Sequence, residues 1–169
     1  DIIRLNTITE RFSKIGAAPA LKKENLTTVM QTAIDYIRTR TSSKVVFSLQ
    51  NQQNYDVEVP LNVPLFEWVL ENLFKNAIDA MSGEGSITVR IADQNQFIYL
   101  DVTDTGKGIP KSKYKTVFKP GYTSKNRGWG LGLSLSKRIV EEYHGGQIFV
   151  KSSEPGKGTT FRIVLKKSA

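Results

Sequence analysis

Three polar side chains with the chemistry of metal and phosphate ligands, Asn72, Asn76 and Asp79, recur at a spacing of four and then three residues. On an α-helix this spacing places them within about 60° of one another, beside the apolar face. Asparagine competes for backbone hydrogen bonds and is a mediocre helix former, so the stripe requires partners or a ligand. A single asparagine there is more often a buried structural amide. A stripe that faces a phosphate site instead favours magnesium, which accepts a carboxamide oxygen and takes other ligands from water and phosphates.

Asp104 is a carboxylate that continues the apolar side of a predicted strand. Alternation places Ile98, Leu100, Val102 and Asp104 on one face of that strand. Taken alone, Asp104 is typical of a turn before Gly106. The functional alternative is a carboxylate at the floor of an apolar pocket, where it accepts a hydrogen bond from a ligand.

Glycines cluster in the second half of the chain, where they can allow unusual dihedral angles or close approach of a ligand. Eight of the thirteen are Gly106, Gly108, Gly121, Gly128, Gly130, Gly132, Gly156 and Gly158. The spacing matches neither a P-loop nor a dinucleotide-binding fingerprint. What remains is a glycine-rich segment that opens a helix, and backbone amides at a helix start can bind phosphate.

The net charge of +8 is concentrated in one segment, 105–127, which contains no acidic residue. Its seven basic residues are Lys107, Lys111, Lys113, Lys115, Lys119, Lys125 and Arg127. A charge run is usually a solvated loop. Nucleic-acid binders spread their basic residues along a face with interleaved aromatics, so a single basic loop bracketed by glycines fits a compact polyanion, such as a nucleoside triphosphate, better.

Length and composition limit the elements that can position these groups. A chain of 169 residues, 39% hydrophobic and 24% charged, is expected to form one globular domain rather than a disordered or fibrous chain. No apolar run approaches the roughly 18 residues of a membrane span. The absence of cysteine excludes a disulfide scaffold, a zinc-thiolate site and a cysteine nucleophile, and fits a reducing cytoplasm. Because the chain opens with Asp1 and shows no signal peptide, we interpret it as part of a longer protein.

The hydrophobic periodicity predicts helices layered on one face of a mixed sheet. Residues 1–15 read as the end of a long helix, with Leu5, Ile8, Phe12 and Ile15 forming a seam for a partner helix upstream. The remaining elements are expected as a helix over 29–39, a pair of strands over 45–49 and 55–59, a helix from 62 to about 81, a hairpin of strands 86–92 and 96–103, a helix over about 130–143, and strands over 147–151 and 159–165.

Five ordered segments resemble the N, G1, F, G2 and G3 boxes of the catalytic and ATP-binding domain of sensor histidine kinases. They are Glu71–Ala80, Asp104–Pro110, Phe118–Lys125, Gly128–Leu133 and Gly156–Phe161. The resemblance covers about residues 26–165. It implies a Bergerat fold, an α/β two-layer sandwich whose mixed, mostly antiparallel sheet is covered on one face by about three helices. Residues 1–20 resemble the end of the second dimerisation helix with its linker, and 21–169 the catalytic domain.

The resemblance assigns roles to matching positions. Asn76 would coordinate Mg²⁺, Asp104 would accept a hydrogen bond from the adenine amine, and Lys125 would reach the phosphates, so Asn76 and Lys125 are the expected catalytic residues. Gly106 and Gly108 would let the base lie close, Phe118 would anchor a lid over 105–127, and Thr159 or Thr160 would support the network around Asp104. The complete expected nucleotide site is Asn72, Asn76, Asp79, Asp104, Gly106, Gly108, Ile109, Phe118, Thr123, Lys125, Gly128, Gly130, Leu131, Gly132, Leu133, Thr159 and Thr160.

Two departures from related families refine the expected activity. Gyrase-type ATPases carry a water-activating glutamate where this chain has Asn72, and Glu71 points about 100° away, so we expect poor hydrolysis. The only histidine, His144, lies at a predicted helix end and lacks the acidic residue that usually follows a phosphoacceptor, so the acceptor is expected outside this chain.

The resemblance therefore implies ATP and Mg²⁺ as cofactors. It implies as partners the protein's own dimerisation helices and a response regulator, but no nucleic acid. The full-length protein is expected to be a homodimer, this part alone a monomer, and the domain to lie on the cytoplasmic side of an inner-membrane-anchored sensor. A regulatory ATPase module of the chaperone or mismatch-repair kind is the alternative, and a nucleic-acid-binding module comes third.

Overall fold

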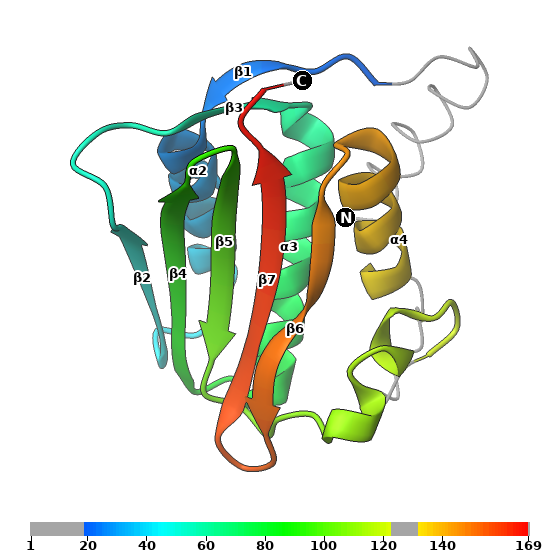
Figure 1. Cartoon of the computed structure of the whole chain (residues 1–169). Coiled ribbons are helices and arrows are strands. Elements are labelled where there is room, and N and C mark those ends of the chain that lie inside the picture. Colours follow the sequence, from blue (N-terminus) through cyan, green and yellow to red (C-terminus); the bar gives the residue numbers. More distant parts are fainter. Residues whose placement is uncertain (1–18, 123–131, 169) are drawn as a thin grey trace.

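A twisted sheet of five strands in the order β2–β4–β5–β7–β6 forms one layer of the molecule, and helices α2, α3 and α4 cover one of its faces (Figure 1). This computed structural model describes residues 19–122 and 132–168. The elements are β1 (Lys22–Asn25), α2 (Leu26–Arg38), β2 (Val45–Asn51), β3 (Glu58–Leu61), α3 (Val63–Ala80), β4 (Gly85–Gln94), β5 (Phe97–Asp104), η1 (Lys111–Lys113), η2 (Thr116–Phe118), α4 (Gly132–Arg138), η3 (Ile139–Tyr143), β6 (Gln147–Glu154) and β7 (Gly158–Lys166). The predicted α/β two-layer class, with a mostly antiparallel sheet, is confirmed.

The two long helices begin at asparagine caps. The side chain of Asn62 accepts a hydrogen bond from the Leu65 amide at 3.2 Å, and a proline in the first turn pre-sets the backbone of α3. Asn25 caps α2 in the same way through the Thr28 amide. The predicted helix from Asn62 to about Met81 is confirmed, and α2 begins three residues earlier than predicted.

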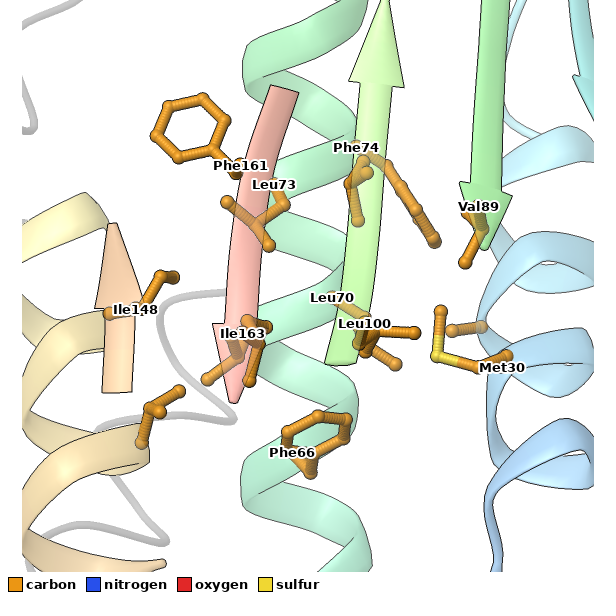
Figure 2. Packing of buried hydrophobic residues seen from close by; sticks show 14 of the residues in the cluster. Met30, Phe66, Leu70, Leu73, Phe74, Val89, Leu100, Ile148, Phe161 and Ile163 are labelled. Carbon is orange, nitrogen blue, oxygen red and sulfur yellow. The ribbon is translucent and has the colours of Figure 1, made fainter. Parts of the chain in front are cut away.

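The hydrophobic core lies between α3 and the inner face of the sheet. Figure 2 shows Phe66, Leu70 and Phe74 of α3 packed beneath Leu100 of β5 and Ile163 of β7, and all five side chains are at most 1% exposed. Each fully buried side chain of this size contributes about 1.5–3 kcal/mol relative to an exposed one. The core therefore holds α3, whose C-terminal half carries the asparagine stripe, firmly against β5 and β7.

The predicted pairing of strands 45–49 and 55–59 is wrong. β2 instead runs parallel to β4, with Val45 opposite Gly85, and β3 pairs antiparallel with β1 in a separate two-stranded sheet. A parallel pair needs a long crossover, and α3 between β2 and β4 provides it. β1 was not predicted, because its sequence Lys-Lys-Glu-Asn has no apolar alternation.

The other predicted strands are confirmed, and the last helix is confirmed with a change in its second half. α4 continues from Arg138 into a π-helical turn, η3, which ends at Tyr143. No helix within residues 19–122 and 132–168 is both long enough and apolar enough to cross a membrane.

Candidate functional site

The C-terminal end of α3, the end of β5 and the start of β7 meet at one end of the sheet, which is the lower end in Figure 1. The Lys107 amide, just beyond β5, donates to the Ala80 carbonyl of α3 at 2.9 Å. Thr159 at the start of β7 lies opposite Asp104 in the β5–β7 ladder. These contacts bring the predicted carboxylate close to the end of the helix that carries the asparagine stripe.

Asp104 is a buried carboxylate, 5% exposed, and its Oδ1 accepts a hydrogen bond from the Gly106 amide at 2.8 Å. Burial raises the pKa of Asp104, while backbone hydrogen bonds from Gly106 and Thr159 act in the opposite direction. The turn geometry and the buried position, which the sequence left as alternatives, therefore both hold. A carboxylate has about four acceptor positions, so Asp104 can bind a further donor from a ligand.

Gly106 and Gly108 allow three chain segments to pack closely beside Asp104. A Cβ on Gly106 would lie 2.7 Å from the backbone of Ala80, and one on Gly108 would lie 2.2 Å from the Glu154 carbonyl oxygen. Gly108 also has φ +81°, in the region that favours glycine. The structure thus gives both glycines a role in joining the loop to α3 and β6, in addition to the expected approach of a base.

The asparagine stripe runs along α3 from a half-buried to an exposed position. Asn72 Nδ2 donates to Ser136 Oγ at 3.2 Å, and Ser136 Oγ donates to the Gly132 carbonyl at 2.7 Å. A Cβ on Gly132 would lie 2.5 Å from Asn72 Oδ1. Asn72 therefore fastens the first turn of α4 to α3. Asn76 follows one turn later and is half-buried, and Asp79 is exposed.

Ser136 is a positioning residue that the sequence did not predict. It is 0% exposed, and its hydroxyl is the link between Asn72 and α4. The only available signal was its place four residues after Gly132, where a serine can bond to a carbonyl of the preceding turn.

Thr159 and Thr160 face opposite sides of the sheet. Thr159 is buried beside Asp104, whereas Thr160 Oγ1 lies 2.8 Å from Thr103 Oγ1, which belongs to the other face. Of the two threonines expected near Asp104, only Thr159 is therefore placed to support it from the buried face.

The basic segment has an anchored part at Phe118 and an exposed part made of its lysines. The Phe118 ring packs edge-on against Phe161, with centroids 6.0 Å apart, and Lys137 Nζ lies 5.6 Å from the Phe118 centroid. Ile109 and Leu133 are partly buried against the same core. The exposed lysines of the segment are Lys107, Lys111, Lys113, Lys115 and Lys119.

Several predicted site residues lie outside the described part of the chain. They are Thr123, Lys125, Gly128, Gly130 and Leu131. The helical seam expected over residues 1–15 also falls there. Their roles stay predictions.

His144 lies far from Asp104, at the other end of α3. Its Nε2 accepts a hydrogen bond from the Asn62 amide at 3.1 Å, so Nδ1 carries the proton and donates to the Ile139 carbonyl at 2.9 Å. Burial lowers the pKa of His144. The 18-residue helix between Asn62 and the site spans about 27 Å. The interpretation of His144 as a helix-end residue that binds a carbonyl is confirmed.

Two hollows on the described surface lie away from this site. One, of about 230 Å³, is lined mainly by His144, Gly145, Leu165 and Lys166. The other, of about 350 Å³, lies between the end of α2 and the start of β2. Neither is lined by a residue of the predicted nucleotide site.

Comparison with known proteins identifies a family and its fold. Residues 62–169 match the family described as histidine kinase-, DNA gyrase B-, and HSP90-like ATPase. Sporulation kinase E of Bacillus subtilis is 32% identical over 98% of this chain and 22% of its own length. Sensor histidine kinase ZraS of Escherichia coli K12 is 34% identical over 96% of this chain and 35% of its own length. The chain thus spans about a fifth to a third of these relatives.

Solved structures of histidine kinases share the architecture. The catalytic domain of histidine kinase ThkA superimposes with a TM-score of 0.78 at 26% identity, and covers 88% of this chain and 96% of that one. The same kinase crystallised with the response regulator TrrA matches with a TM-score of 0.76 at 25% identity, over 98% of this chain and 48% of that one.

Proposed function

The chain belongs to the family of histidine kinase-, DNA gyrase B- and HSP90-like ATPases, and from this premise we propose that it is the ATP-binding catalytic domain of a sensor histidine kinase. Its activity would be transfer of the γ-phosphoryl group of Mg-ATP to a histidine on an adjoining dimerisation helix. The phosphate would then pass to a response regulator in two-component signalling.

The observation that carries the proposal is the buried carboxylate of Asp104, which the Gly106 amide holds at the end of β5. The exocyclic amine of adenine can donate a hydrogen bond to this acceptor. Guanine presents a carbonyl oxygen at the corresponding position, so two acceptors would face each other. A hydrogen bond to a charged group contributes about 1.5–3 kcal/mol, which corresponds to roughly 10- to 150-fold in affinity.

The residues present fit a magnesium ion that arrives with the nucleotide. Within the described residues, no group of three or more His, Cys, Asp or Glu side chains is arranged to hold a metal. Asn76 offers a half-buried carboxamide one turn before Ala80, to which the Asp104 loop is bonded. When bound, the ion offsets negative charge on the phosphates. The role of Asn76 would be to supply one oxygen ligand, and water and phosphates would supply the others.

The polar contacts of α3 support phosphoryl transfer over hydrolysis. Asn72 stands where related ATPases have their water-activating glutamate, and its amide is engaged with Ser136. The neighbouring Glu71 is 3% exposed, and helix geometry points it about 100° away from Asn72. Neither side chain is suited to activate an attacking water, so we expect the γ-phosphoryl group to be saved for a histidine.

The environment of His144 supports an acceptor on another segment. Both of its ring nitrogens are hydrogen-bonded, and the ring is buried far from Asp104. We propose that the acceptor lies on the dimerisation helices of the full-length homodimer, with this domain on the cytoplasmic side of an inner-membrane-anchored sensor. The complex crystallised for ThkA supports the proposal of a response regulator as partner.

Titration calorimetry with ATP and GTP, each with Mg²⁺, tests the adenine site. The wild-type chain should prefer ATP, and Asp104→Ala should lower ATP affinity roughly 10- to 150-fold without unfolding the chain. Asp101→Ala is the matched control, because it removes a buried carboxylate from the same strand that is paired with Arg162 on the other face. It should cost thermal stability and leave the ratio of ATP to GTP affinity unchanged. Equal affinity of the wild-type chain for the two nucleotides would contradict the assignment.

A further inference from the structure

A hydrogen-bonded network of hydroxyl groups connects the strand opposite Asp104 to the first half of the predicted lid, 105–127. Thr159 lies opposite Asp104 in the sheet and is 4% exposed. Its Oγ1 is 2.7 Å from Ser153 Oγ on β6. Thr159 therefore links Ser153 to the position of Asp104, although β6, which carries Ser153, does not pair with β5.

The hydrogen bonds around the Ser153 hydroxyl define which groups donate and which accept. Its Oγ donates its single proton to the Gly158 carbonyl at 3.0 Å and accepts from the Ile109 amide at 2.7 Å. Because that proton is used, the hydroxyl of Thr159 must be the donor in the Thr159–Ser153 contact. One oxygen thus joins β6, the start of β7 and the loop that leaves Asp104.

Tyr114 holds Ser153 in place from the other side. Its hydroxyl donates to the Ser153 carbonyl and accepts from the Ser153 amide, both at 2.7 Å. β6 is an edge strand, so its outer amides and carbonyls have no strand to pair with at this point. A single phenolic oxygen supplies both partners that a neighbouring strand would otherwise provide.

Backbone contacts reinforce the same junction. The Gly156 amide donates to the Lys107 carbonyl at 2.7 Å, and Gly108 lies so close to Glu154 that any side chain would collide with its carbonyl. The loop from Asp104 to Tyr114 is therefore fastened along the end of the β6–β7 hairpin.

We propose that Ser153 and Tyr114 are positioning residues for the adenine-binding carboxylate. Ser153 acts through Thr159, which lies buried directly opposite Asp104 in the β5–β7 ladder, and Tyr114 acts by holding Ser153 at the open edge of β6. Adenine recognition consequently depends on the docking of segment 107–118 against β6. This inference rests on the proposed function, because it assigns Asp104 to adenine.

The test compares Ser153→Ala and Tyr114→Phe with the wild-type chain by calorimetry with ATP and with GTP. Each variant should lose about three- to tenfold in ATP affinity, the effect of one or two neutral hydrogen bonds, and little in GTP affinity, so the ATP-to-GTP ratio should fall. Ser153→Thr keeps the hydroxyl and should restore the ratio. Tyr55→Phe is the matched control, because it removes a phenolic hydroxyl that is bonded to Asp93 at the other end of the sheet. It should leave both affinities unchanged.

A double-mutant cycle separates positioning from general stabilisation. In an Asp104→Ala background, Ser153→Ala and Tyr114→Phe should change ATP affinity less than about twofold, because the group they position is gone. Equal losses for ATP and GTP, full additivity with Asp104→Ala, or wild-type affinity in both variants would each overturn the inference. Should Ser153→Ala fail to fold, Tyr114→Phe removes a single half-buried oxygen and carries the same test alone. A wild-type chain that binds no ATP would refute the proposed function instead.

Discussion

Lowering the pH tests whether the buried, neutral imidazole of His144 contributes to the stability of the fold. Neutral His144 accepts a hydrogen bond from the amide of Asn62, the residue that caps α3. A protonated imidazole cannot accept this bond, and Lys166, which lines the same hollow, offers it no compensating negative charge. Burial accordingly lowers the pKa of His144 below its ordinary value of about 6.5.

The sign and the size of the effect follow from proton linkage. As the pH falls below about 6.5, the unfolded chain binds a proton that the folded chain does not, so the free energy of unfolding decreases. The loss approaches about 1.4 kcal/mol per pH unit and stops once the pH reaches the lowered pKa of the folded state. Between pH 7.5 and 5.5, His144 can therefore remove at most about 1.4 kcal/mol of stability. Above pH 7.5 it is neutral in both states and has no effect.

Urea unfolding of the wild-type chain and of His144→Gln, from pH 8 to pH 5, measures this loss. Glutamine does not titrate, so the wild-type curve should fall more steeply than the variant's curve below pH 6.5. The raised pKa of Asp104 acts with the opposite sign, but both proteins share it and it cancels in the difference. The chain has a single histidine, so its imidazole resonances report the folded-state pKa without ambiguity. Parallel curves for the two proteins, or titration of His144 at or above pH 6.5, would refute the reasoning.

Two further predictions concern phosphoryl transfer. Asn76→Ala should reduce the effect of Mg²⁺ on ATP affinity while the helix remains, because alanine is the better helix former; calorimetry with and without Mg²⁺, together with circular dichroism, measures both, and an unchanged Mg²⁺ effect would place the metal ligand elsewhere. The chain alone should not become labelled by ATP with a radioactive γ-phosphate, yet should label a separate helical hairpin that carries an acceptor histidine, at a rate that rises with hairpin concentration. His144→Gln should leave that rate nearly unchanged, and an acid-labile label on the isolated chain that disappears in this variant would contradict the role of His144.

Elements with local signals could be predicted from the sequence. α3 has its cap at Asn62, a proline in its first turn and an apolar face, and all three signals lie within the helix itself. β4 and β5 are joined by a tight turn at Asn95, which adopts φ 69°, and their alternation is intact. Such features depend on near neighbours in the chain, so the structure agrees with them.

Strand pairing over long separations could not be predicted in the same way. β2 pairs with β4 across the whole of α3. Val46 on β2 is apolar although it is 62% exposed, so the apolar residues of this strand do not mark its buried face alone. β1 is polar along its length and acquires its partner β3 only through tertiary structure. The prediction paired β2 with β3, its neighbour in sequence, whereas the partner of β2 is β4, which follows the crossover helix α3.

The same distinction between local signals and contacts distant in sequence applies to the residues of the candidate site. Asp104 was found because alternation alone places it on the apolar face of β5. Ser136, Ser153 and Tyr114 were not predicted, because each hydroxyl has a partner that is distant in sequence: Asn72, the Ile109 amide and the Ser153 carbonyl respectively. The choice between Thr159 and Thr160 likewise needed the register of β7 against β5.

The polar contacts of α3 lie at separate places along the helix, so that stability and nucleotide recognition can be tested separately. The helix is fastened by polar contacts at three levels, through the Asn62 amide to His144, through Asn72 to Ser136, and through the Ala80 carbonyl to Lys107. The first contact lies about 27 Å from the last. Its loss weakens the start of the helix, whereas the buried apolar side chains between Phe66 and Ala77 still hold the remaining turns against the sheet. Protonation of His144 therefore acts on the free energy of unfolding, and the geometry around Asp104 depends on the hydroxyl network and on the last turn of the helix.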